Sequence, residues 1–240
     1  MGEQSKQFWT GVRSEIPLLI GGFPFGLIYG ALALNAGLSK AAALLMSSTV
    51  FAGSAQFITA QLVHEHTPGF VIVLTIAVVN LRHMLYSASL APYLAALPVR
   101  WKILLSYLLT DEAYAPTILH YEKEGITPQA HWFLLGAGAV LWADWQLSTA
   151  LGIFLGAAIP ESWSLLDFAL PLTFIAMVVP VLRDRPAIAA ALSAGIVALL
   201  AFSLPYQLGL ILAALVGIVV GTVLEGRKSS AVNQPQGEIS

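Results

Sequence analysis

The sequence predicts an all-α, polytopic membrane protein with about seven or eight transmembrane helices. Hydrophobic residues make up 58% of the 240 residues and charged residues only 10%, whereas ordinary soluble domains carry about 25% charged residues. The mean hydropathy is +0.80. A transmembrane helix needs about 20 apolar residues, and several stretches of this chain reach that length. No polar stretch is long enough for a soluble domain.

Polar and helix-breaking residues divide the chain into apolar stretches. The expected spans are 16–36, 41–63, 69–97, 103–119, 131–158, 165–182, 187–203 and 206–224. Ser39 is a cap signal for the second span, Thr127-Pro128 precedes the fifth, and Asp184-Arg185-Pro186 begins the seventh. Because the shortest stretches only just cross a bilayer, a count of seven remains open.

We expect three segments: a cytoplasmic N-terminal segment 1–15, a transmembrane domain 16–224 and a disordered polar tail 225–240. The first apolar stretch exceeds the usual signal-peptide core, which predicts a retained span. With eight spans, Lys and Arg are more numerous on the side of both termini, and the positive-inside rule assigns that side to the cytoplasm. A re-entrant hairpin over 69–97 would shift this balance.

Several functional classes are excluded. The net charge is −2 and no basic run occurs, so nucleic-acid binding is not expected. The absence of cysteine removes disulfides, thiolate catalysis and iron–sulfur sites. His64-Glu65-His66 offers too few ligands for a metal site, and no P-loop for ATP occurs. We therefore predict no catalytic residue, metal or cofactor.

The first span predicts a helix broken by glycine and proline. The run Gly21-Gly22-Phe23-Pro24-Phe25-Gly26 contains a proline that removes a backbone donor and obstructs the preceding turn. Transporters bind solutes with the backbone groups that such breaks expose, so Gly22, Pro24 and Gly26 are candidate substrate-binding residues. Glycines at this spacing also form a flat strip for helix packing.

Two polar strings interrupt the third and fourth spans, Asn80-Leu81-Arg82-His83 and Thr110-Asp111-Glu112. A charge at the bilayer centre costs about 2.5–3.5 kcal/mol on insertion scales, so it is rarely retained without a role. Arg82 can bind a carboxylate through two parallel hydrogen bonds. The alternative is an ion pair with Asp111, because consecutive antiparallel spans bring their midpoints to the same depth.

The neighbouring polar residues each have two interpretations. Asn80 and His83 share one helix face, and His83 could relay protons or bond a backbone carbonyl. Asp111 and Glu112 point about 100° apart on a helix, so only one can line the interior. Asp144, in the middle of the fifth span, could face an ammonium group or proton, or lie at an interface.

Small and hydroxyl side chains crowd the second span around Ser54 and Gln56. Tight helix packing accounts for most such residues. The primary amide of Gln56 needs hydrogen-bond partners in this setting, so it could contact substrate or exposed backbone.

Four motifs together resemble a known family. They are Pro24-Phe25-Gly26, Met46-Ser47-Ser48-Thr49-Val50-Phe51-Ala52-Gly53-Ser54-Ala55-Gln56-Phe57, the segment from Asn80-Leu81-Arg82-His83 to Ala91-Pro92, and Leu109-Thr110-Asp111-Glu112. Over about residues 15–116 the chain resembles the AzlC family, the large subunit of bacterial branched-chain amino-acid exporters. The resemblance implies a two-component exporter of valine, leucine and isoleucine in the inner membrane, acting with a small AzlD-type subunit. Asp144 matches no motif of that family.

The residues themselves favour a secondary transporter of a zwitterion, coupled to an ion or proton gradient. Two sets of candidates follow: substrate binding by Arg82, Asn80, Gln56, Ser54, Gly22, Pro24 and Gly26, and coupling or ion pairing by Asp111, Glu112, His83 and Asp144. One alternative is an intramembrane serine hydrolase with Ser54 as nucleophile and His83 as base. Another is a passive channel.

Overall fold

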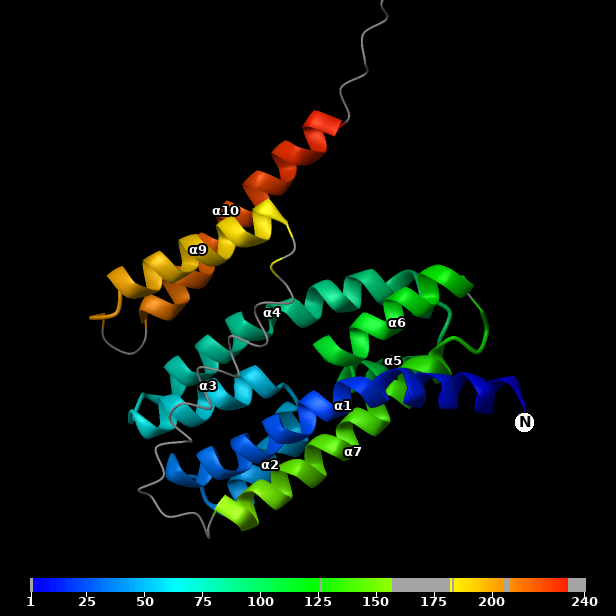
Figure 1. Cartoon of the computed structure of the whole chain (residues 1–240), viewed down its shortest axis with the longest axis horizontal. Coiled ribbons are helices and arrows are strands. Elements are labelled where there is room, and N and C mark those ends of the chain that lie inside the picture. Colours follow the sequence, from blue (N-terminus) through cyan, green and yellow to red (C-terminus); the bar gives the residue numbers. More distant parts are fainter. Residues whose placement is uncertain (1, 126, 157–181, 183, 205–207, 233–240) are drawn as a thin grey trace, which may run out of the picture. The chain divides into compact units, whose positions relative to one another are not determined.

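The computed structural model describes residues 2–125, 127–156, 182, 184–204 and 208–232, and all regular elements in those ranges are helices (Figure 1). The chain divides into two compact units, residues 1–167 and 168–240. The predicted all-helical architecture is confirmed for the described residues.

The first unit contains α1 (Glu3–Asn35), α2 (Lys40–Val50), α3 (Gly53–His64), α4 (Gly69–Leu94), α5 (Val99–Tyr107), α6 (Asp111–Glu124) and α7 (His131–Gly156). The second unit contains α9 (Arg185–Leu200) and α10 (Leu208–Val232). Among the described helices, α1 and α4 have the length and apolar composition to cross a bilayer. The number of spans stays a prediction, and the expected span 165–182 lies outside the described residues except at its last residue.

Helices α1 and α7 pack along each other, and theirs is the most extensive helix–helix contact in the described part of the first unit (Figure 1). Small residues make this approach possible: a Cβ added to Gly30 would lie 2.4 Å from the Thr149 carbonyl oxygen, and one added to Gly152 would lie 2.2 Å from that of Leu27. Gly11 meets Phe133, and Gly156 meets Ala31. Because the residue numbers of the contacts rise in the same direction along α1 and α7, the two helices run parallel.

The first helix is not broken, contrary to the sequence prediction. Helix α1 continues from Glu3 to Asn35 with Pro17 and Pro24 inside it. Both prolines are exposed, on the side away from the buried contact with α7. A proline inside a helix costs about 3 kcal/mol, and packing along the length of α7 offsets this cost.

The breaks lie instead in the second and fourth predicted spans. Between α2 and α3, Phe51 has a φ of 29° and Ala52 is extended. Between α5 and α6, Leu108 and Leu109 leave the helix and Thr110 is extended before Asp111 begins α6. All three residues of the second break are buried.

The structure also tests the expected re-entrant hairpin and two of the expected helix caps. Helix α4 is continuous over Gly69–Leu94, so the re-entrant hairpin is not formed. Ser39 and Asp184 cap α2 and α9 as predicted, accepting hydrogen bonds from the amides of Ala42 and Ala187.

The predicted segment boundaries at 15 and 224 fall inside helices. Helix α1 begins at Glu3, and α10 continues to Val232. Residues 225–232 are therefore helical rather than part of a disordered tail, because a helix need not end where its apolar stretch ends. The division into a transmembrane domain and two terminal segments stays a prediction.

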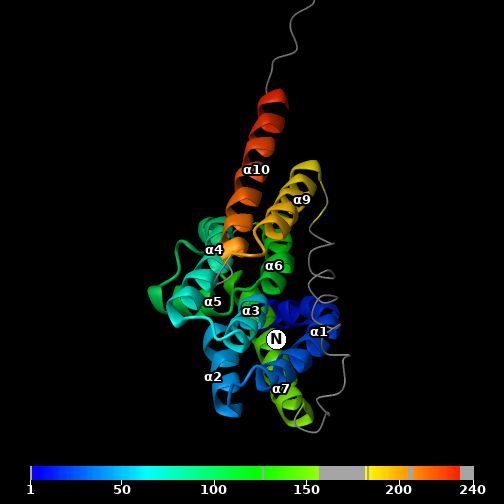
Figure 2. The ribbon, with the colours of Figure 1, turned by 90° about the vertical axis from the view of Figure 1, so that its left-hand side faces the viewer.

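In the second unit, α9 and α10 form an antiparallel pair (Figure 2). Gly209 lies against Ala201, whereas Gly217 and Gly221 lie against Ala190. The order of contacts reverses along the two helices, as a hairpin requires.

The α1–α7 contact predicts opposite effects of one substitution at two glycines of α1. Gly30→Ala should lower stability by about 1–3 kcal/mol, because the new methyl group collides with the backbone of Thr149. Gly21→Ala is the matched control, since nothing lies within 4 Å of its Cβ position. We expect this control to be neutral or more stable by up to about 1 kcal/mol. Thermal unfolding midpoints in detergent would test this, and equal midpoints would contradict the packing described.

Candidate functional site

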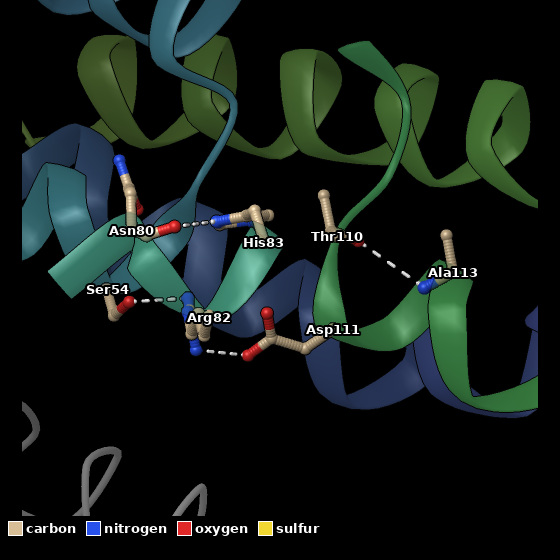
Figure 3. Close-up of polar contacts among 7 residues, drawn as sticks. All are labelled: Ser54, Asn80, Arg82, His83, Thr110, Asp111 and Ala113. Carbon is tan, nitrogen blue, oxygen red and sulfur yellow. Dashed lines mark hydrogen bonds and ion pairs between the residues drawn. The ribbon is translucent and has the colours of Figure 1, made fainter. Parts of the chain in front are cut away.

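The Arg82 side chain connects three helices at the two helix breaks (Figure 3). One guanidinium nitrogen donates to Asp111 Oδ2, the first residue of α6, and forms an ion pair with it. The other terminal nitrogen donates to Ser54 Oγ, in the first turn of α3, at 2.7 Å. The ion pair that was one alternative for Arg82 is therefore formed, and Ser54 completes the group.

Local sequence explains why Asp111 lies at a helix start. Thr110 caps α6, with its hydroxyl oxygen accepting a 3.4 Å hydrogen bond from the Ala113 amide (Figure 3). Helix N-termini carry partial positive charge and favour anions. Arg82 thus lies between the N-termini of α3 and α6. Its guanidinium and the two helix N-termini are all positive, and together they favour one carboxylate, here that of Asp111.

The C-terminal ends of α2 and α5 also meet. Tyr107, the last residue of α5, donates its hydroxyl proton to the Ser48 carbonyl oxygen near the end of α2. Trp142 of α7 donates to the same Tyr107 hydroxyl at 2.6 Å. Gln146 of α7 donates to the Ser47 carbonyl oxygen at 3.1 Å. Side chains therefore satisfy carbonyl groups that the break in this span leaves without helical partners.

Three polar atoms around the ion pair have no partner among the described residues. They are Arg82 Nε, Asp111 Oδ1 and Asn80 Oδ1, and each is buried. The Arg82 and Asp111 side chains are each 27% exposed, so the pair is partly accessible. One donor and two acceptors at this site therefore lack a hydrogen-bond partner among the described residues.

His83 and Glu112 lie beside this group and are not bonded to it. His83 Nδ1 bonds the Asn80 carbonyl oxygen at 3.2 Å, the backbone alternative considered for it (Figure 3). Glu112 is exposed on the first turn of α6. Of the two adjacent carboxylates, Asp111 is the one that faces Arg82.

Gln56 belongs to a separate buried group on α3. Its Oε1 accepts a 3.0 Å hydrogen bond from Trp145, while its Nε2 has no partner among the described residues. The rings of Phe25 and Tyr29 from α1 each pack against Trp145 and against Phe57 from α3. The structure thus places Gln56 in an aromatic core.

The candidates on α1 face α7 or open space and contact none of the Arg82 group in the described contacts. Gly26 lies against Ser148 of α7, and Pro24 is exposed. Gly22 faces Asp144, whose Oδ2 would lie 3.6 Å from an added Cβ. That Oδ2 is buried and has no partner in the described part of the chain. The break in the first helix on which their expected role rested is not formed, and substrate binding by these three residues stays a prediction.

Sequence reasoning missed Glu15 and Tyr107. Glu15 is fully buried, although it was assigned to the polar N-terminal segment. Its position gave a signal: Gly11, Glu15, Gly22 and Gly26 follow one another at helical spacing on one face of α1. Tyr107 gave none, because its carbonyl partner is set by tertiary structure.

Within the described ranges, no group of three or more His, Asp or Glu side chains is arranged to hold a metal ion. Ser54 Oγ accepts a hydrogen bond from Arg82, and His83 bonds Asn80. The serine–histidine pair of a hydrolase is therefore not formed among these residues.

Comparison with known proteins identifies the group to which these motifs belong. The AzlC protein family matches residues 17–159, which span α1 to α7. The chain belongs to the AzlC family. An uncharacterised membrane protein of Archaeoglobus fulgidus is 31% identical over 220 residues, covering 89% of this chain and 94% of that protein. No solved structure matches.

Two further relatives carry more informative names. Inner membrane protein YgaZ of Escherichia coli is 25% identical over 224 residues, covering 90% of this chain and 89% of YgaZ. The branched-chain amino acid transport protein AzlC of Bacillus subtilis is 28% identical over 174 residues, covering 70% of this chain and 67% of that protein. These relatives support a membrane location for the chain.

The Arg82 ion pair predicts a measurable coupling between two substitutions. Arg82→Gln or Asp111→Asn alone leaves a partly buried charge without its partner, whereas the double variant removes both charges. We expect a coupling free energy of about 0.5–3 kcal/mol in a double-mutant cycle of unfolding. Glu122→Gln is the control, because Glu122 is an exposed acid farther along the same helix. Strictly additive effects of the Arg82 and Asp111 variants would contradict direct pairing.

Proposed function

We propose that this chain is the transporter subunit of a secondary exporter of branched-chain amino acids in the bacterial inner membrane. The observation that carries the proposal is Arg82, partly exposed and held between the N-termini of α3 and α6. The name of the Bacillus subtilis relative supports the substrate class. The resemblance to the AzlC family supports outward transport.

In the proposed cycle, the substrate carboxylate replaces Asp111 on Arg82. An amino-acid carboxylate can take the same charge-assisted hydrogen bonds, and the N-terminus of α3 adds its partial positive charge. Ser54 Oγ and the unpartnered Arg82 Nε lie beside the position proposed for the substrate carboxylate. Asn80 Oδ1 and the released Asp111 carboxylate are then acceptors for the substrate ammonium group. Substrate binding therefore requires the resting ion pair to open.

The aliphatic side chain requires an apolar space near these charges. A cavity of about 350 Å³ lies between α4, α5 and α7. Its apolar lining includes Leu90, Leu105, Leu109 and Leu134, and its polar lining consists of Ser87, Ser106 and Lys102. Leu109 belongs to the break that precedes Asp111, and Ser87 follows His83 by one helical turn. This cavity is our candidate for the aliphatic side chain.

Opening the ion pair would also release the two half-helices from each other. Arg82 holds α3 and α6, and movement of half-helices about their breaks is one way to expose a site to each side in turn. We propose that an ion or proton gradient drives the movement, with Asp111, Glu112, His83 and Asp144 as candidate coupling residues. Both termini lie in the cytoplasm if the chain has eight spans.

Counterflow of leucine tests the proposed function. Vesicles that contain the chain together with its AzlD-type subunit and are preloaded with leucine should accelerate uptake of labelled leucine, as a carrier does. Arg82→Ala at normal membrane abundance should lower this exchange about a hundredfold or more, because two charge-assisted hydrogen bonds together contribute at least about 3 kcal/mol. Arg100→Ala is the control, since Arg100 is exposed on α5. Wild-type exchange in Arg82→Ala would refute the site, and linear, non-saturating flux would indicate a channel.

The small partner subunit is a separate prediction. The resemblance to the AzlC family implies a small AzlD-type membrane subunit, and we propose that this chain requires one. Cells expressing the chain with such a subunit should export leucine, whereas cells expressing either alone at equal abundance should not. Full export by the chain alone would contradict the requirement.

A further inference from the structure

Glu15 is the acidic residue that the proposed substrate site leaves without a role. Its side chain is completely buried in α1, and both carboxylate oxygens lack a hydrogen-bond partner in the described part of the chain. A charged carboxylate in such a place costs far more than a neutral one. The site therefore favours a carboxyl group that carries a proton.

The register of α1 against α7 gives the depth of Glu15 in the first unit. Gly11 faces Phe133–Ala137 and Gly26 faces Ser148, which places Glu15 near Gly138–Leu141. Gly138 in turn contacts Leu108, the first residue of the α5–α6 break. Glu15 therefore lies at the level of the break that carries Asp111.

The charged surroundings of Glu15 differ from one neighbouring helix to the next. Helix α6 packs against α1 and carries Glu112 in its first turn, so the charge of Glu112 acts on Glu15. On α7, the residues at its level are apolar, and α2 and α3 meet α1 farther along, at Tyr29 and Phe25. On α1 itself, Arg13 is exposed. A buried carboxyl group thus interacts with an accessible one, and no cation among the described residues neutralises it.

We propose that Glu15 binds the proton that this transporter exchanges for substrate, and that Glu112 passes this proton between Glu15 and water. In the transfer, the O–H bond of the Glu15 carboxyl breaks and an O–H bond forms on the Glu112 carboxylate. Glu112 then releases the proton to water, and no electron is transferred. The inference rests on the proposed transport function, which it extends by naming the coupling ion and its site.

The link to substrate follows from the position of Glu112. It is the residue after Asp111 in the first turn of α6, so any movement of α6 when Arg82 releases Asp111 also moves Glu112 relative to Glu15. Two interacting carboxylates hold one proton more readily than none. Changing their separation therefore changes whether Glu15 retains its proton.

Two transport assays, one that needs proton movement and one that does not, test the proposed role of Glu15. Glu15→Gln mimics the protonated carboxyl and should keep leucine counterflow, because exchange needs no net proton movement. The same variant should lose leucine accumulation driven by a pH gradient, together with leucine-driven proton movement reported by a pH-sensitive dye inside proteoliposomes. Glu15→Asp keeps a titratable group and should retain part of the coupling. Glu3→Gln is the matched control, because Glu3 is an exposed acid on the same helix.

Each other outcome has a definite meaning. Gradient-driven accumulation in Glu15→Gln at the wild-type level overturns the proposal. So does loss of both assays in a variant with unchanged abundance and unfolding midpoint, since Glu15 would then act on substrate binding.

A measurement without transport separates this proposal from the proposed function. Infrared spectra of the purified protein should contain a protonated-carboxyl band that Glu15→Gln removes and Glu3→Gln retains. If the wild type shows that band and no leucine counterflow, the proposed substrate fails while Glu15 remains a proton-binding site. If no band depends on Glu15, the proton site is refuted.

Discussion

The arrangement of the first unit depends on the Arg82 guanidinium, which joins the N-terminal ends of two half-helices through Ser54 and Asp111. An uncompensated arginine in a membrane helix costs several kcal/mol on insertion scales, and the Asp111 carboxylate removes most of that cost. At the start of α6, the Thr110 hydroxyl accepts from the Ala113 amide, and the Asp111 carboxylate lies where helix N-termini favour an anion. The ion pair of Arg82 is therefore formed at the break that begins α6.

The opposite ends of the same breaks are held by neutral groups. Tyr107 and Gln146 donate to the carbonyl oxygens of Ser48 and Ser47, and Trp142 fixes the Tyr107 hydroxyl. These bonds carry no charge, so a charged ligand does not compete for them. The N-terminal side, by contrast, depends on an ion pair that another carboxylate can replace. The proposed site thus has one side held by neutral hydrogen bonds and one side held by an ion pair that a substrate carboxylate would replace.

The sequence predicts which charged side chains pair better than it predicts where the backbone leaves the helix. Pairing of Arg82 with Asp111 was foreseeable, because two costly charges on consecutive spans satisfy each other. Pro24 indicated a break in the first helix, yet α1 continues because that proline faces away from α7. The actual break at Phe51 contains no proline, and its carbonyl partners come from α5 and α7. Such a break is a property of the tertiary structure, which local sequence does not encode.

Glu15 shows the same limit for a titratable group. Glu15 lies between Arg13 and the first long apolar stretch, so the sequence assigns it to a polar terminus. Only the packing of α1 against α7 and α6 buries it. Its burial also gives the proposed cycle an energetic logic. If Glu15 stays neutral while Arg82 is paired with Asp111, Glu112 is the remaining carboxylate at that level without an ion pair among the described residues. When substrate opens the ion pair, its ammonium group takes the place of Arg82 beside Asp111, and movement of α6 changes the separation of Glu112 and Glu15, so that in the proposed exchange Glu15 releases its proton. Substrate and proton would then be linked through α6 without touching the same residue.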